Sequence, residues 1–185
     1  ADGWVYDPRD LRPGDLEQTE MTSYITDQTA ALNLFGAGVV YHSEPFAEAT
    51  EISGNAKLRV WLAMDVPDAD LQASLYEILP DGSSVLLTGQ FLRARYRGSR
   101  SREELVTPGA VLRYDLDRFA WFSRRVAKGS RLRLVLQSPN SIQLEKNYGS
   151  GKPVATESGA DARVAHLTVY HDAGHPSALE IPVVH

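Results

Sequence analysis

The feature that most constrains the fold is a series of short segments in which apolar and polar residues alternate, with glycine, proline, asparagine and aspartate between the segments. In residues 57–65, for example, Leu58, Val60 and Leu62 occupy every second position. Because successive side chains of a strand point to opposite faces, this period of two predicts strands with one buried face. Its recurrence along the chain predicts an all-β domain of antiparallel strands.

Ten strands are predicted beyond Gly38, at residues 39–42, 50–53, 57–65, 71–79, 84–88, 91–96, 111–116, 131–138, 164–170 and 178–184. The turn sequence Pro80-Asp81-Gly82-Ser83 predicts a hairpin between residues 71 and 88. Short helical pieces are expected only at 102–105 and within 30–35. Because these strands must bury their apolar faces against one another, we expect a two-sheet antiparallel β-sandwich or jelly roll.

The chain has 185 residues, which suits one domain with one core. Residues 1–37 are rich in Asp, Pro, Gly, Thr and Gln, so we expect an extended N-terminal arm or linker there and the sandwich in residues 38–185. A net charge of −5 argues against a nucleic-acid partner. No apolar stretch suggests a membrane partner or a signal peptide, and a cytoplasmic location is the default expectation.

Sequence motifs for catalysis and cofactor binding are absent. The chain has no cysteine, and no G-x-S-x-G string that would place a nucleophilic serine on a strand-to-helix turn. The sequence around Gly149-Ser150-Gly151-Lys152-Pro153 departs from a phosphate-binding loop, because Lys146 and Pro153 stand where Gly and Ser or Thr are needed. We therefore expect no catalytic residue and no cofactor in this chain.

Two groups of residues could ligate a metal, and each has an ordinary alternative. Asp65, Asp68 and Asp70 could bind calcium or could lie in a solvated turn. His166, His171 and His175 could be ligands or a catalytic base, or polar residues at the rim of the last hairpin. On one continuous strand His166 and His171 would point to opposite faces, so we expect no metal site.

Two further clusters suggest a contact surface. Arg93, Arg95 and Arg97 would share one face of a strand, where they could bind an anion, contact another domain or form solvated pairs with Glu103 and Glu104. Trp121 and Phe122 belong to a run with Phe119 that cannot all face one core, so exposed members could mark an interface, unless a loop buries them from both sides.

Taken together, an ordered set of segments resembles the C-terminal jelly-roll domain of the X-prolyl dipeptidyl-peptidase and cocaine esterase (CocE/NonD) family of serine hydrolases. These segments are Val40–Phe46, Asp65–Leu71, Leu75–Gly82, Leu92–Arg97, Lys128–Leu134, Ser138–Asn140 and Tyr170–Ser177, and Trp4–Asp10 resembles the family's connector from the hydrolase domain. The stretch Tyr24–Gly38 departs from the family pattern, so no pocket residue is carried over.

The resemblance implies a jelly roll of the galactose-binding-like kind. It also implies a non-catalytic accessory domain whose partner, in the same parent chain, is an α/β-hydrolase domain that hydrolyses esters or amides. This domain would support the active site and the packing of domains or subunits, and a homo-oligomer is plausible. The alternative function is a free-standing module that binds carbohydrate or another ligand. A G-x-S-x-G segment encoded upstream of Ala1 would favour the first function.

Overall fold

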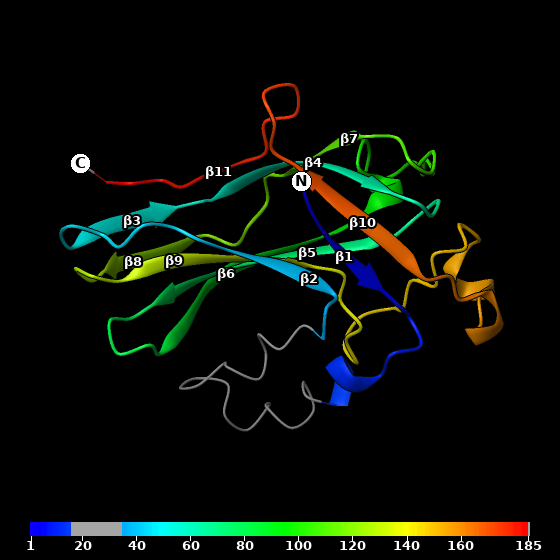
Figure 1. Ribbon diagram of the computed structural model, residues 1–185, viewed down its shortest axis with the longest axis horizontal. Helices are drawn as coiled ribbons and strands as arrows, with labels where there is room; N and C mark the ends of the chain where they lie inside the picture. Colours follow the sequence, from blue (N-terminus) through cyan, green and yellow to red (C-terminus); the bar gives the residue numbers. More distant parts are fainter. Residues whose placement is uncertain (16–34, 185) are drawn as a thin grey trace.

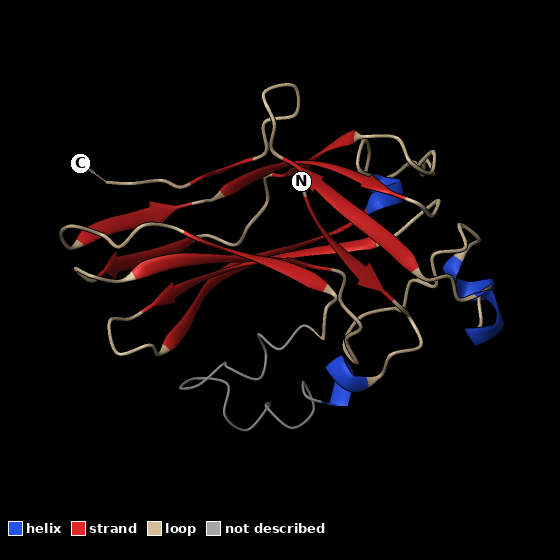
Figure 2. Cartoon of the chain, in the orientation of Figure 1, coloured by secondary structure: helices blue, strands red, loops and turns tan. Residues whose placement is uncertain are grey.

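The chain forms two layers of antiparallel strands that face each other across one core (Figures 1 and 2). The computed structural model describes residues 1–15 and 35–184. The strands are β1 (Asp2–Tyr6), β2 (Gly38–His42), β3 (Thr50–Gly54), β4 (Lys57–Met64), β5 (Asp70–Ile78), β6 (Ser84–Arg93), β7 (Leu112–Leu116), β8 (Phe122–Val126), β9 (Arg131–Gln137), β10 (Ala165–Tyr170) and β11 (Ala178–Glu180). Three 3-10 turns are η1 (Ala94–Tyr96), η2 (Val154–Thr156) and η3 (Gly159–Asp161).

One layer has the strand order β1-β10-β4-β11, with β7 also paired to β4, and the other has the order β2-β9-β5-β6. A small third sheet consists of β3 and β8. All of these pairings are antiparallel. The expected antiparallel β-sandwich is therefore confirmed.

The core follows the alternation that predicted the strands. On β4 the side chains of Leu58, Val60, Leu62 and Met64 are each 5% exposed or less. They belong to one hydrophobic cluster with residues of the facing sheet, such as Leu136 on β9. Burial of these apolar faces is the main favourable contribution to folding.

The predicted hairpin is confirmed, since β5 pairs with β6 and Gly82 adopts a φ of 88° at the turn. The two segments predicted at 84–88 and 91–96 are instead one strand, β6, which ends at Arg93. Residues 102–105 are not helical, because the Glu104 N–H donates to the distant Arg95 carbonyl instead of to a helical neighbour. Of the other expected helical piece, residues 30–34 lie outside the described residues.

Two strands were not predicted, β1 and β8. Residues 2–6 belong to the sheet, with Trp4 and Tyr6 buried in the core, so this part of the expected arm is integrated in the sandwich. Residues 16–34 of the expected arm are outside the described part. In the described residues there is no helix with the length and hydropathy that crossing a bilayer requires.

Candidate functional site

The three arginines of the predicted cluster lie where β6 leaves its sheet. Arg93 is the last residue of β6, Arg95 lies in η1, and Arg97 follows η1. The interpretation that all three share one strand face is therefore wrong. The change of direction turns Arg95 into the protein, where its side chain is 2% exposed.

The partners of the first two arginines are the aspartates that precede and begin β5. Asp68 is 0% exposed and accepts hydrogen bonds from the backbone N–H and the Nε of Arg95, both at 2.8 Å. Asp70 is 3% exposed and accepts from Nε and Nη2 of Arg93 at 2.8 and 3.0 Å. The solvated-turn interpretation is therefore wrong for both aspartates. Only Asp65 is exposed, and it contacts His166.

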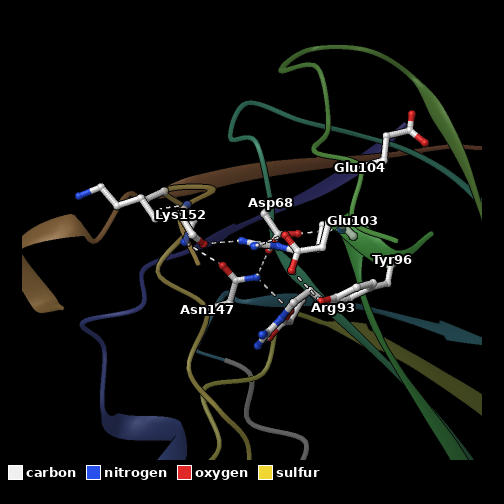
Figure 3. A network of polar contacts seen from close by, with 12 residues as sticks. Asp68, Arg93, Tyr96, Glu103, Glu104, Asn147 and Lys152 are labelled. Atoms are coloured by element: carbon white, nitrogen blue, oxygen red, sulfur yellow. Dashed lines mark hydrogen bonds and ion pairs between the residues drawn. The ribbon is translucent and has the colours of Figure 1, made fainter. Parts of the chain in front are cut away.

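Asn147 joins the two ion pairs, as Figure 3 shows from close by. Its Nδ2 donates to Asp68 at 2.8 Å and to Asp70 at 3.0 Å, and its Oδ1 accepts from the N–H of Gly149. Arg95 also donates through Nη2 to the carbonyl of Lys152 at 2.9 Å. The network therefore fixes the long loop between β9 and β10 against the start of β5.

The outer side of the network carries glutamates. Arg93 Nη1 lies 2.9 Å from Glu145, Arg95 Nη1 lies 3.4 Å from Glu103, and Arg97 Nη2 lies 2.7 Å from Glu104. Tyr96 donates to the other oxygen of Glu103 at 2.8 Å. Each of the three guanidinium groups thus already has at least one carboxylate partner, which occupies donors that an anionic ligand would need.

Burial and pairing shift the acid–base properties of this region. Burial raises the pKa of Asp70, although the hydrogen bonds from Arg93 and Asn147 act against that rise. The hydrogen bond to Asp70 raises the pKa of Arg93. Burial and the nearby charge of Asp70 raise the pKa of Tyr6, whose hydroxyl donates to the carbonyl of Asn147 at 3.4 Å. The paired guanidinium group of Arg93 is therefore charged at neutral pH and belongs to the folded framework.

The aromatic run is divided between the core and the surface. Phe119 is 1% exposed in the core, and Phe122, the first residue of β8, packs against the core. Trp121 is 82% exposed. The loop that carries it is anchored at two positions just before Trp121, since Thr88 donates to the Ala120 carbonyl at 2.7 Å and Gln90 accepts from the Arg118 N–H at 2.6 Å. Trp121 is therefore an exposed aromatic side chain on a fixed loop.

The histidines of the last hairpin lie apart from one another. His166 is exposed on β10 and its Nδ1 is 2.7 Å from Asp65. His171 follows β10, with Nδ1 3.7 Å from Asp2. His175 stacks edge-on against Trp61, with the ring centroids 5.2 Å apart. No group of three or more His, Cys, Asp or Glu side chains suited to a metal occurs in the described part of the chain.

Two buried polar residues that hold loops or strands in place were not predicted from the sequence. One is Asn147, which no periodic pattern marks. The other is Glu77, 0% exposed on β5, which accepts from Arg124 at 2.6 Å and from the Ala127 N–H at 3.0 Å. A usable signal existed for one ion pair, because the hairpin register places Asp70 opposite Arg93. Opposite charges at facing positions of a predicted hairpin indicate a cross-strand pair.

A family model supports the assignment that the sequence resemblance suggested. The model that describes the X-Pro dipeptidyl-peptidase C-terminal non-catalytic domain matches residues 4–180. Among curated proteins, cocaine esterase of Rhodococcus sp. (strain MB1 Bresler) is 25% identical over 187 residues. That alignment covers 100% of this chain and 32% of the esterase.

Solved structures share the fold at lower identity. An aminopeptidase from a marine sediment archaeon, Thaumarchaeota archaeon, has a TM-score of 0.85 and 22% identity, with 100% of this chain and 33% of that chain covered. An alpha-amino acid ester hydrolase has a TM-score of 0.86 and 18% identity, with 99% and 32% covered. A CocE/NonD family hydrolase from Staphylococcus aureus has a TM-score of 0.64 and 16% identity, with 99% and 33% covered. This chain therefore spans about one third of the length of each relative.

Proposed function

The chain belongs to the X-Pro dipeptidyl-peptidase C-terminal non-catalytic domain family, and from this premise we propose that it serves as the accessory domain of a larger serine hydrolase. The reaction of the parent protein would be hydrolysis of esters or amides through an acyl-enzyme, with the nucleophile in a separate α/β-hydrolase domain. The observation that carries this proposal is the coverage, because relatives named as hydrolases match all of this chain with only a third of their own length.

The polar network supports a role in packing rather than in turnover. It fixes the loop after β6 through Arg95 and the loop between β9 and β10 through Asn147, so side-chain hydrogen bonds hold both loops in a defined shape. Loops held in one conformation lose less entropy when another domain packs against them. We propose that these two loops form part of the surface that meets the hydrolase domain.

Trp121 is the second element of the proposed interface. Tryptophan is enriched among the residues that dominate binding energy at protein interfaces, and here it is presented on an anchored loop. An 82% exposed tryptophan offers a large apolar area that water hydrates poorly. Contact with the hydrolase domain would bury this area.

The test uses the hydrolase domain of the parent protein and this chain as separate polypeptides. We expect the two to associate, and Trp121→Ala to weaken the dissociation constant about tenfold or more. The matched control is Val40→Ala, which truncates another exposed apolar side chain. Absence of association between the unmodified polypeptides would contradict the proposal, whereas equal effects of the two substitutions would remove only Trp121 from the interface.

The exposed tryptophan also favours the alternative function, because aromatic side chains on β-sandwich loops can stack on sugar rings. A carbohydrate-binding module would bind soluble oligosaccharides with an affinity that Trp121→Ala abolishes. We expect no such binding.

We also propose that the parent protein forms a homo-oligomer, and light scattering on the parent protein tests this. A cytoplasmic location stays a prediction.

A further inference from the structure

The sandwich has a gap at one edge of β4, beside the loop between the last two strands. β10 pairs with Trp61–Met64 and β11 pairs with Lys57–Arg59, while β7 pairs with Leu58–Leu62 and occupies the other edge. Between β10 and β11 the chain leaves the sheet as residues 171–177, the protruding loop near the top of Figure 1. Along the edge of β4 that β10 and β11 share, no strand of the described residues therefore pairs with Val60.

Ser177 closes the base of this loop. The backbone N–H of Trp61 donates to Ser177 Oγ at 2.9 Å, and the same hydroxyl donates to the Tyr170 carbonyl at 2.5 Å. The serine thus replaces the missing strand as a hydrogen-bond partner for the backbone. Below β4, the side chains of the described residues leave a space open beside this gap.

That space is a cavity of about 380 Å³ between the two sheets. Its walls are mainly aliphatic and come from both layers, with Val60 on β4, Leu134 on β9, Val169 on β10 and Leu179 on β11 among them. The volume falls within the range typical of small-molecule sites, about 300–1,000 Å³. The exposed lining residues His42, His171 and Ala178 mark the side that reaches solvent.

The polar side chains on the lining are largely occupied within the protein. Ser43 donates to the Glu44 carbonyl and accepts from the Leu132 N–H, and Tyr41 donates to Asp2 at 3.1 Å. Ser177 is paired as described above, and His42 Nε2 accepts from Arg133 Nε at 2.8 Å. A charged group moved from water into this space would therefore lose its hydration without gaining compensating hydrogen bonds.

His171 is the exception, at the mouth. Its Nδ1 faces Asp2 at 3.7 Å, and its Nε2 has no partner among the described residues. The side chain is 45% exposed. One hydrogen-bonding group of a ligand could therefore be met at the mouth, while the interior offers only apolar contact.

We propose that this cavity binds an uncharged aliphatic molecule, whose alkyl chain lies between the sheets and whose single polar group contacts His171. Medium-chain alcohols represent this class. The inference rests on the gap at β4, the aliphatic walls and the paired polar lining. It does not depend on the role of the domain in a larger hydrolase.

Titration calorimetry of the 185-residue chain with 1-octanol tests the proposal. We expect saturable 1:1 binding and a melting temperature that rises with ligand concentration, because a ligand bound only by the folded state stabilises it. Ala178→Trp places a large side chain at the mouth and should reduce the affinity at least tenfold. The matched control Ala120→Trp adds the same side chain at another exposed alanine, outside the cavity lining, and should leave the affinity unchanged.

Two further measurements test the chemical class of the ligand and the location of its binding site separately. Octanoate should bind at least tenfold more weakly than 1-octanol, and His171→Ala should weaken octanol binding by a few fold without unfolding the chain. Octanoate binding as tightly as octanol would overturn the proposed ligand class. Absence of octanol binding to the folded chain, or binding that Ala178→Trp does not change, would overturn the site.

Discussion

The two ends of the sandwich solve the same packing problem in different ways. At the start of β5, charged and amide side chains from three separate segments fill the space between the loops and pair with one another. At the start of β4, where β11 pairs with it, aliphatic side chains line the cavity but do not fill it. The polar end is therefore the more tightly specified region, because each buried charge there depends on a particular partner.

Removing one partner at the polar end should have the largest effect. Arg95→Met leaves the carboxylate of Asp68 buried without its cation, and we expect the free energy of unfolding to fall by about 3–5 kcal/mol. Urea denaturation monitored by circular dichroism measures this change. In the control Arg9→Met the ion pair with Asp7 is exposed, and the denaturation midpoint should stay nearly unchanged.

A double substitution sharpens the interpretation of this loss. Asp68→Asn combined with Arg95→Met removes both charges, so much of the penalty for an unpaired buried charge should disappear. The double variant should therefore be more stable than Arg95→Met alone. If the double variant loses as much stability as Asp68→Asn and Arg95→Met lose together as single substitutions, the two charges act independently.

Enlarging a side chain should have opposite effects inside and outside the cavity. Leu134→Phe extends into the cavity and should raise the free energy of unfolding by about 0.5–2 kcal/mol. Its cross-strand neighbour Leu75 is 0% exposed and is not part of the lining, so Leu75→Phe should lower it by about 1–3 kcal/mol. Equal destabilisation by both substitutions would show that the cavity cannot accept added volume.

Stability should fall in acid, and Glu77 provides a way to isolate one cause. Burial alone would raise its pKa, but hydrogen bonds from the Ala127 N–H and from Arg124 hold the pKa below the ordinary value of 4.5. A lowered folded-state pKa contributes stability above about pH 4.5 that is lost as the pH falls through the folded-state value. The difference in stability between the unmodified chain and Glu77→Gln should therefore shrink between neutral pH and pH 3.

Asp70 acts in the opposite sense, because burial raises its pKa. A raised carboxyl pKa contributes stability at low pH that is lost as the pH rises through the folded-state value. Asp70 is present in both the unmodified chain and Glu77→Gln, so its contribution cancels in the difference between their free energies of unfolding. A difference that grows toward pH 3 would contradict the assignment for Glu77.

The smallest effect on the isolated chain is expected at the exposed tryptophan. Trp121→Ala should change the free energy of unfolding by no more than about 0.5 kcal/mol, because the side chain is 82% exposed and packs little within the domain. Thermal denaturation checks this expectation. A large loss of stability would assign Trp121 to the core of the domain instead of to a contact surface.

Much of the sandwich could be predicted because alternation is a local property of each strand. β8 was missed because its sequence Phe122–Val126 carries Arg124 and Arg125 and pairs only with β3 in a small sheet. β1 was missed because it has five residues and includes Gly3. That glycine is needed there, since a Cβ would lie 2.7 Å from the carbonyl oxygen of Leu167 on β10.

The candidate site was less accessible from sequence. The contacts of Asp68 with Arg95 and Asn147 join residues 27 and 79 positions apart, and no period of the sequence encodes such distances. The aromatic run did predict that some members would be exposed, and Trp121 is. Residues that alternate can be assigned to faces, whereas residues that meet only through loops need the three-dimensional structure.

The accessory role is tested by comparing hydrolysis of a chromogenic ester by the parent protein and by this chain alone. If the chain is a non-catalytic accessory domain, the parent protein should turn over the ester and the 185-residue chain should show no rate above buffer. Turnover by the isolated chain that disappears in His171→Ala would contradict the account and would place a catalytic site in this domain.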